Sequence, residues 1–286
     1  MNRVDLHLHT TASDGTDTPL ELVRHAARAG LEVIAITDHD TLKGALELSD
    51  STDLPIKVVT GIEFSCNIRG VDNSNCHILG YAFDPCHVKI TEAIAHGRAM
   101  RLLKLDKRLE YLRDTFGIVF SDEEISELRG YNSVAKPHLA NLIVRHGLAS
   151  SVGDAIEKYL NGVRLPDDRI DAREAIEAIL AAGGVPVYAH PIGGEREKRL
   201  GEKQLRKRVC ALADMGLMGL ECYYSRYTRE EEALILKVAR EHGLTVSAGS
   251  DYHGSNKTVV IGTLSAEHGE IPTENITVLS EILKRI

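Results

Sequence analysis

Histidines and carboxylates recur in this chain where the strands of a sheet would end. His7 and His9 lie two residues apart in a short apolar run, so on a strand both imidazoles would point to the same face. Asp251 and His253 repeat this spacing near the C-terminus. Paired imidazole and carboxylate groups chelate divalent transition-metal ions, and such ions catalyse hydrolysis. The spacing therefore predicts a metal centre.

The predicted ligands are six histidines and three carboxylates. Each alone would more often be a surface or structural residue, but all nine fall independently near strand ends. His77 is the exception in position, because it lies near the start of its predicted strand. The full set is His7, His9, Asp14, His39, Glu63, His77, His190, Asp251 and His253.

Short β-branched runs alternate with helical patterns along most of the chain. Thr18-Pro19-Leu20-Glu21 has the capping residue, the early proline and the reciprocating glutamate of a helix N-terminus. Repeated β-loop-α units indicate a parallel sheet, open or closed into a barrel, whose functional groups gather at the carboxyl ends of strands. Strands are predicted at Val4–His9, Val33–Thr37, Lys57–Phe64, His77–Ala82, Val185–Ala189, Met218–Cys222 and Thr245–Ala248.

The middle of the chain interrupts this alternation. Leucines from Leu102 to Leu112, together with Phe116, recur at steps of three and four, which predicts a long helix. Further helices are expected after Ser121, Ser133 and Ser151. We expect a discontinuous barrel domain (1–97 and 169–286) and a helical insert (98–168). Residues 98–170 carry 12 Lys and Arg against 11 Asp and Glu, which suits a cap over an anionic substrate, although a solvated helical hairpin would look the same.

Composition narrows the class of protein. The 286 residues are 43% hydrophobic and 27% charged, as in soluble globular proteins, and no apolar run is long enough to span a membrane. The N-terminus has no apolar signal segment, so a cytoplasmic location is expected. The net charge of −8 argues against binding long nucleic acid, but not against a small anionic substrate, because bound divalent ions reverse the local field. The oligomeric state stays open.

The pattern resembles the PHP family, the polymerase and histidinol phosphatase domain. Its motifs match His7-Leu8-His9 with Asp14, Thr37-Asp38-His39-Asp40, His190-Pro191 and Ser250-Asp251-Tyr252-His253, and Glu63 and His77 fill the remaining positions. The resemblance implies a distorted seven-stranded (β/α) barrel with two or three divalent ions. It assigns His7, His9, Glu63 and Asp251 to the first ion, Glu63, His77 and His190 to the second, and Asp14, His39 and His253 to the third.

The donor types suit Mn²⁺, with Fe²⁺ or Zn²⁺ as alternatives. We expect a hydroxide bridging two ions across Glu63 to attack phosphorus in line, without a covalent enzyme intermediate. Glu63, His253 and Asp38 are the predicted catalytic residues, the last two for proton transfer or for orienting other groups.

The helical insert makes the chain most similar to the PHP proteins that act on nucleotides. In that group a basic-Pro-His segment lies in the insert, matched here by Lys136-Pro137-His138. The expected reaction is removal of the 3′-phosphate from nucleoside 3′,5′-bisphosphates. Lys136, His138 and Arg226 would bind the second phosphate, and Tyr224 or its neighbour Tyr223 would stack on the base.

Three alternatives remain open. The chain could be a 5′-to-3′ exonuclease on short oligonucleotides or a histidinol-phosphate phosphatase. A non-enzymatic, metal-stabilised module is disfavoured, because a structural ion needs no cluster of nine ligands.

Overall fold

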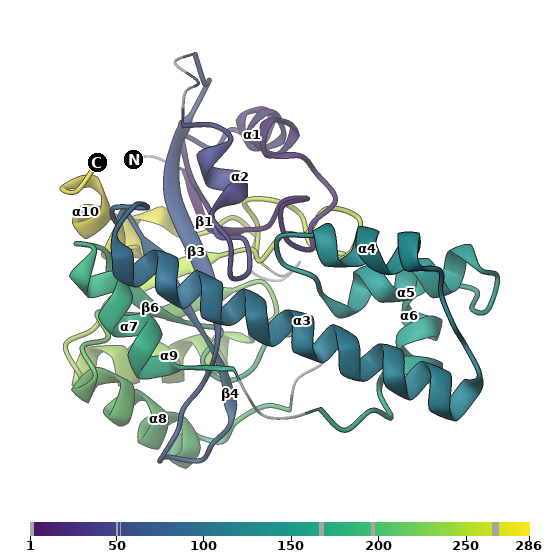
Figure 1. The fold of residues 1–286 in the computed structure, drawn as a ribbon. Coiled ribbons are helices and arrows are strands. Elements are labelled where there is room, and N and C mark those ends of the chain that lie inside the picture. Colours follow the sequence, from purple (N-terminus) through teal and green to yellow (C-terminus); the bar gives the residue numbers. More distant parts are fainter. Residues whose placement is uncertain (1–2, 50, 52, 166–168, 196–197, 265–268) are drawn as a thin grey trace.

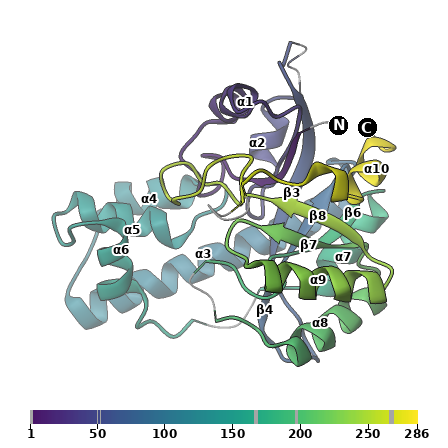
Figure 2. The same ribbon diagram turned by 180° about the vertical axis from the view of Figure 1, so that it is seen from behind.

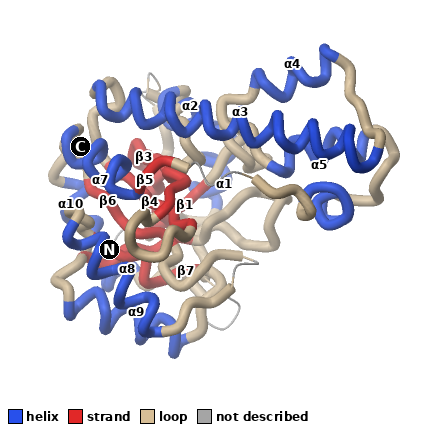
Figure 3. The backbone as a smooth tube through the Cα atoms, turned by 60° about the horizontal axis from the view of Figure 1, so that its bottom comes forward, coloured by secondary structure: helices blue, strands red, loops and turns tan. Residues whose placement is uncertain are grey.

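Eight strands form one sheet at the centre of the molecule, with helices around it (Figure 3). The computed structural model describes residues 3–49, 51, 53–165, 169–195, 198–264 and 269–286. The strands are β1 (Val4–Leu8), β2 (Val33–Ile36), β3 (Lys57–Asn67), β4 (Asn75–Tyr81), β5 (Ile170–Asp171), β6 (Val185–Ala189), β7 (Gly219–Tyr224) and β8 (Thr245–Gly249). All seven predicted strands are present, and β5 is an addition.

The sheet curls into a nearly closed barrel. Its strand order is β1-β2-β3-β4-β6-β7-β8, with β5 paired beside β3. The segment after β8 returns to β1, where the amide of Asp251 donates to the carbonyl of His7 and the amide of His9 donates to the carbonyl of Tyr252. These bonds join the two ends of the sheet and place the first and last predicted ligands side by side. The expected distorted (β/α) barrel is confirmed.

One strand runs against the predicted direction. The sheet is parallel through β1, β2 and β3 and again through β6, β7 and β8, but β4 is antiparallel to both of its neighbours. The connection from β3 to β4 is too short to hold a crossover helix, so the chain turns back directly. The expectation of a purely parallel sheet is therefore wrong at β4.

Helices cover the outside of the barrel and form the insert. The capping box at Thr18 and Glu21 is present as predicted, and Thr228 with Glu231 forms another. The helices are α1 (Pro19–Arg28), α2 (Lys43–Leu46), α3 (Val88–Phe116), α4 (Asp122–Gly130), α5 (Lys136–Arg145), α6 (Val152–Ala155), α7 (Ala172–Ala181), α8 (Glu202–Asp214), α9 (Arg229–Glu241) and α10 (Val278–Leu283), with a π-helix η1 (Ile156–Leu160) and a 3₁₀ turn η2 (Thr273–Asn275).

Helix α3 belongs to both the barrel and the insert. Ile90 and Ala93 in its first half join the main core, whereas Leu105 and Leu112 in its second half join a separate apolar cluster with α4, α5 and η1. Figures 1 and 2 show this helix running from the barrel wall out along the insert. The expected boundary at residue 98 thus falls inside a continuous helix. No helix in the described part of the chain is long and apolar enough to cross a membrane.

Candidate metal centre

All nine predicted ligands meet at one end of the barrel. His7 lies on β1 and Glu63 on β3, while His39, His190 and Asp251 follow β2, β6 and β8. His77 reaches the same end because β4 is antiparallel, so its first residues lie beside the carboxyl ends of its neighbours. It pairs with Ser65 on β3 and with Ala189, the residue before His190, on β6.

Glu63 lies between two groups of histidines. Its Oε2 is 3.2 Å from Nε2 of His7, 3.2 Å from Nε2 of His9 and 3.1 Å from Nδ1 of His39. Its Oε1 is 2.8 Å from Nδ1 of His77 and 3.1 Å from Nε2 of His190. One carboxylate thus faces potential ligand atoms on both sides.

Asp251 completes the group on the β1 side. Its Oδ1 lies 3.5 Å from Nε2 of His7 and 3.4 Å from Nε2 of His9. Its Oδ2 accepts hydrogen bonds from the hydroxyl of Tyr224 (2.8 Å) and from Nζ of Lys257 (2.5 Å). Tyr224 and Lys257 thus bind Oδ2 of Asp251, while Oδ1 faces the histidines.

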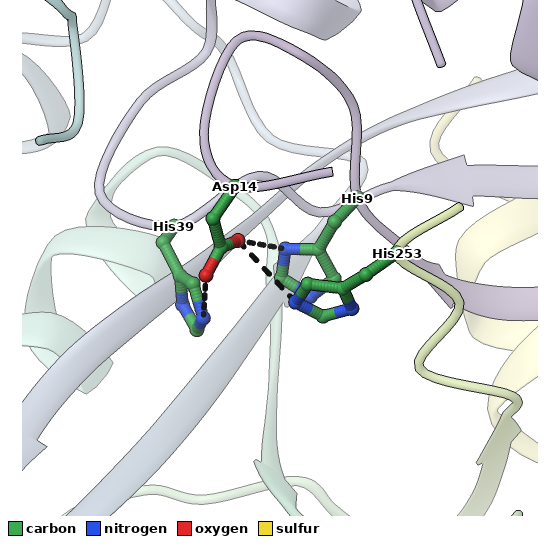
Figure 4. Close-up of side chains that lie close together, drawn as sticks. All are labelled: His9, Asp14, His39 and His253. Carbon is green, nitrogen blue, oxygen red and sulfur yellow. Dashed lines mark ion pairs between the residues drawn. The ribbon is translucent and has the colours of Figure 1, made fainter. Parts of the chain in front are cut away.

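A third group surrounds Asp14 (Figure 4). Its Oδ1 lies 3.3 Å from Nε2 of His253 and 3.7 Å from Nδ1 of His9, and its Oδ2 lies 4.0 Å from Nε2 of His39. The four residues present ligand atoms within 4.8 Å of one another. His9 therefore takes part in two groups, through different ring nitrogens.

Several ligand atoms in this cluster are buried without a hydrogen-bond partner among the described residues. They are Nε2 of His7, Nε2 of His9, Oδ1 of Asp14, Nδ1 of His39 and Oε2 of Glu63. Buried polar atoms without partners are costly and rare in folded proteins. Five of them converge on one space, and all are of types that bind divalent metal ions, so the cluster is a candidate metal-binding site.

The charges of the cluster suit cations. Burial raises the pKa of the Glu63 carboxyl, but His39, His7 and His77 outweigh burial and hold this pKa well below its usual range. Burial likewise raises the pKa of Asp251, and Lys257, His7 and His253 reverse the effect. Burial also lowers the pKa of His39 well below its usual range, although Glu63 and Asp14 oppose this effect.

Glu221 on β7 is a functional residue that the sequence interpretation missed. It is fully buried; its Oε1 lies 2.8 Å from Nδ1 of His7, and its Oε2 accepts from the amide of His190 at 2.7 Å. A carboxylate on the far nitrogen of a ligand histidine fixes its tautomer and orientation. The available cue was a glutamate inside an otherwise apolar strand, Gly219–Tyr224.

The predicted catalytic residues occupy different places. Glu63 and His253 belong to the ligand cluster and line the cavity that opens over it. Asp38 instead lies beneath the loop that carries Asp14. Its Oδ1 accepts from the amide of Thr10 (2.8 Å) and the hydroxyl of Ser13 (2.6 Å), and its Oδ2 accepts from the hydroxyl of Thr10 (2.7 Å). Asp38 thus holds this loop in place.

Two of the predicted substrate-binding residues are committed to other contacts. Tyr224 is 1% exposed and its neighbour Tyr223 is 8% exposed, so neither offers a free ring face for stacking on a base. Tyr224 instead binds Asp251. Arg226 pairs with Glu195 at 3.1 Å on the rim of the cavity.

The other two lie on the insert. His138 accepts a hydrogen bond from the amide of Ala135, and its ring stacks on Tyr131. Burial lowers the pKa of His138, and nearby Asp14 opposes this. Lys136 donates to Oδ1 of Asn161 at 3.0 Å.

A cavity of about 480 Å³ opens over the ligand cluster. Its floor is the cluster, and part of its wall comes from the insert, including Pro137, Val152 and Ile156. A space of this size falls in the range of small-molecule sites. The insert and the barrel together therefore enclose a substrate-sized space at the candidate metal centre.

Fold and site together define a metal-dependent hydrolase. The model of the PHP domain family matches residues 5–184, and the chain belongs to this family. It is an enzyme of the metal-dependent phosphoesterase class.

Several relatives and one solved structure support this class. The chain is 33% identical to a 5′-3′ exoribonuclease of Haemophilus influenzae, over 88% of this chain and 90% of that protein. It is 31% identical to a phosphoribosyl 1,2-cyclic phosphate 1,2-diphosphodiesterase of Eggerthella lenta (87% and 94%), and 26% identical to a 3′,5′-nucleoside bisphosphate phosphatase of Chromobacterium violaceum (88% and 88%). A Bifidobacterium adolescentis structure assigned, without a named substrate, to the metal-dependent phosphoesterases has a TM-score of 0.81 and 30% identity, covering 99% of this chain and 96% of that one.

Proposed function

We propose that the enzyme hydrolyses the phosphate ester on the 3′ side of a nucleotide that also carries a 5′-phosphate. Its simplest substrate is a nucleoside 3′,5′-bisphosphate, from which it removes the 3′-phosphate. The scissile phosphate would lie at the ligand cluster, and the 5′-phosphate would lie in a second cavity beside it.

The observation that carries this proposal is the charge of that second cavity, which has a volume of about 110 Å³. Asp40 is the only carboxylate among its described lining residues, which also include the cations Arg101, Lys104, Arg108, Lys136 and Arg169. Arg108 is 9% exposed, and its Nε has no hydrogen-bond partner in the described part of the chain. A buried guanidinium nitrogen without an acceptor, amid other cations, suits an oxyanion with several acceptor oxygens.

This second cavity, which is called the basic cavity from here on, adjoins the metal centre. Asp40 follows the ligand His39, and Ser65, which also lines the basic cavity, pairs with the ligand His77. Lys136 lines the basic cavity and the next residue, Pro137, lines the larger one. Burial, together with Arg101 and Arg169, lowers the pKa of Arg108 to about 10. A phosphate bound there would relieve this accumulated positive charge.

Each part of the site would have a distinct task in hydrolysis. Divalent ions bound at the cluster would polarise the phosphate and supply a strongly nucleophilic water at neutral pH. Glu63 would hold the two sides of the cluster at a fixed separation, and Glu221 would orient His7. We propose two or three ions, with Mn²⁺ as the physiological metal, because the donor set combines imidazole and carboxylate.

A second candidate function uses the same geometry. A 5′-phosphorylated oligoribonucleotide places its first 3′-phosphodiester where the bisphosphate places its 3′-phosphate, so the enzyme would release mononucleotides from the 5′ end. The 33% identity to a 5′-3′ exoribonuclease favours this reading. Histidinol phosphate fits less well, since its amine would face the cationic cavity.

The test is phosphate release with Mn²⁺ from adenosine 3′,5′-bisphosphate, adenosine 3′-monophosphate, histidinol phosphate and a short 5′-phosphorylated RNA, with product identification. We expect the bisphosphate to yield 5′-AMP, at a kcat/KM far above that of the 3′-monophosphate. Arg108→Met should remove this preference, whereas Arg129→Met, which breaks only an exposed ion pair with Asp106, should keep it. Equal use of both adenosine nucleotides would refute the second-phosphate site.

A further inference from the structure

Arg101 on α3 joins the basic cavity to the barrel. Its Nε donates to Oδ2 of Asp40 at 2.6 Å, and its Nη2 donates to the hydroxyl of Ser65 at 2.9 Å. The same side chain lines the basic cavity beside Arg108. One guanidinium therefore contacts both the proposed 5′-phosphate site and two residues of the barrel.

The two barrel residues are tied to metal ligands. Asp40 follows His39, is 2% exposed, and has a positive φ of 51°. Its amide donates to the carbonyl of Glu63 (3.1 Å), and its Oδ1 accepts from the amide of Ser65 (2.8 Å). Asp40 thus links the end of β2 to β3. Its left-handed backbone conformation costs energy and persists only where neighbouring contacts enforce it.

The helix leaves Arg101 little freedom to move without affecting this junction. At Gly97, one turn earlier on α3, an added Cβ would lie 3.3 Å from Cβ, Cγ and Oδ1 of Asp40. The helix therefore packs directly on the Asp40 side chain. A shift of the Arg101 guanidinium toward or away from the basic cavity changes the contacts of the residue beside His39.

We propose that Arg101 is a positioning residue that couples occupation of the basic cavity to the geometry of the metal ligands. An oxyanion in the cavity accepts hydrogen bonds from Arg101 and offsets its repulsion from Arg108, so the guanidinium stays on Asp40 and Ser65. The segment with His39, Glu63 and His77 is then held in its reactive arrangement. This inference rests on the proposed function, and adds that the 5′-phosphate raises kcat as well as affinity.

Binding energy from a part of the substrate that does not react increases kcat only when it is used to organise the reacting centre. A ligand shifts such an arrangement only by its difference in affinity for the two states. The contacts of Arg101 would supply this difference in affinity. When the guanidinium is bound to Asp40 and Ser65, its remaining N–H groups can donate to an oxyanion in the cavity, and in the other state they cannot.

The test divides the substrate into two pieces. Hydrolysis of adenosine 3′-monophosphate is measured with Mn²⁺ and increasing phosphite dianion, an unreactive probe for the 5′-phosphate. We expect saturable activation of about tenfold or more, equivalent to about 1.4 kcal/mol of barrier. Arg101→Met should abolish the activation and lower kcat for the bisphosphate, while Arg129→Met, an exposed arginine of the same insert, should leave both unchanged.

A binding measurement separates the cavity from the metal centre. Calorimetry of phosphite with the metal-free protein should show binding that Arg101→Met and Arg108→Met each weaken by about tenfold, equivalent to about 1.4 kcal/mol, and that His9→Ala leaves unchanged. Turnover of the bisphosphate without phosphite activation of the monophosphate would overturn the coupling and leave the proposed function standing. An Arg101→Met enzyme with a raised KM and an unchanged kcat would do the same, and no turnover of the bisphosphate would overturn both.

Discussion

Nδ1 of His7 lies 2.8 Å from Oε1 of Glu221, although 214 residues separate the two in the chain. His7 is on β1 and Glu221 is on β7, with β8 between them, and the two side chains meet beside Gly249 of β8. Both side chains are fully buried. The contact with this carboxylate fixes Nδ1 as the protonated nitrogen of His7 and leaves Nε2 available for a metal ion. The position of β7 therefore determines how the His7 ring is oriented.

Replacing Glu221 by Gln should weaken metal binding without unfolding the protein. The amide cannot hold the His7 tautomer as a carboxylate does, and loss of such a partner typically costs about 10- to 100-fold in metal affinity. Titration of Mn²⁺ against a competing chelator measures the change. Glu47→Gln, at an exposed position, is the matched control. Unaltered affinity in the Glu221 variant would show that the carboxylate has only a packing role.

His9 is the ligand whose loss should do the most damage. Its Nε2 faces Glu63 and Asp251 and its Nδ1 faces Asp14, so His9→Ala removes a donor from two groups at once. We expect at least one ion fewer by metal analysis and a fall in turnover of roughly 100-fold or more. His242→Ala, at the end of α9 and remote from the cluster, should behave as wild type. Near-normal turnover of the His9 variant would show that the cluster is not the reactive centre.

Metal removal should destabilise the chain. Five buried ligand atoms lose their partners when the ions leave, and the three carboxylates lose the charges that balance them. Free metal at 100 times its Kd stabilises a folded protein by about 2.7 kcal/mol per site. Thermal unfolding with Mn²⁺ and after chelation measures this directly, and identical midpoints would contradict a preformed metal centre.

Gly249 should not tolerate a side chain. A Cβ there would lie 2.2 Å from Cβ and 2.9 Å from the amide nitrogen of His7, so Gly249→Ala forces β8 and β1 apart where the barrel closes. Overpacking of this kind costs about 1–3 kcal/mol. Denaturant unfolding should show the loss together with weaker Mn²⁺ binding. Gly70→Ala is an unsuitable control because of its positive φ, whereas Gly130→Ala meets no atoms within 4 Å and should cost little.

Asp38 offers a test between a loop-holding and a proton-transferring role. Asp38→Asn replaces an acceptor with a donor against Thr10 or Ser13, which should cost about 1–3 kcal/mol and loosen the loop that carries Asp14. The pH–rate profile should keep its shape at a lower amplitude. Disappearance of one limb of that profile would instead make Asp38 a proton-transfer group.

The strands and the clustering of the nine candidate ligands were predictable because their signals are local. Short apolar runs ended by His, Asp or Glu identify both the strand and its functional end, as at Val33–Ile36 followed by His39. His77 seemed misplaced only because strand direction was assumed. Direction depends on the length of the preceding connection. The predicted strands stopped at Phe64 and resumed at His77, whereas β3 and β4 extend to Asn67 and Asn75, so the link between them is shorter than predicted.

The supporting residues were not predictable in the same way. Glu221 and Arg101 contact partners far away in sequence, and no spacing rule links Glu221 to His7 or Arg101 to Asp40. Tyr224 was expected to face a base, but it lies on a strand whose six residues are all buried. Whether an aromatic residue packs inward or meets a ligand depends on the barrel as a whole.

The continuity of α3 limits how this enzyme can change during evolution. An α-helix advances about 100° per residue, so inserting or deleting one residue between Gly97 and Arg101 would rotate everything beyond that point around the helix axis. Arg101, Arg108 and the walls of both cavities would then face new directions together. Variation in length should therefore accumulate in the loops at the far end of the insert, while the number of residues from the barrel to Arg108 stays constant.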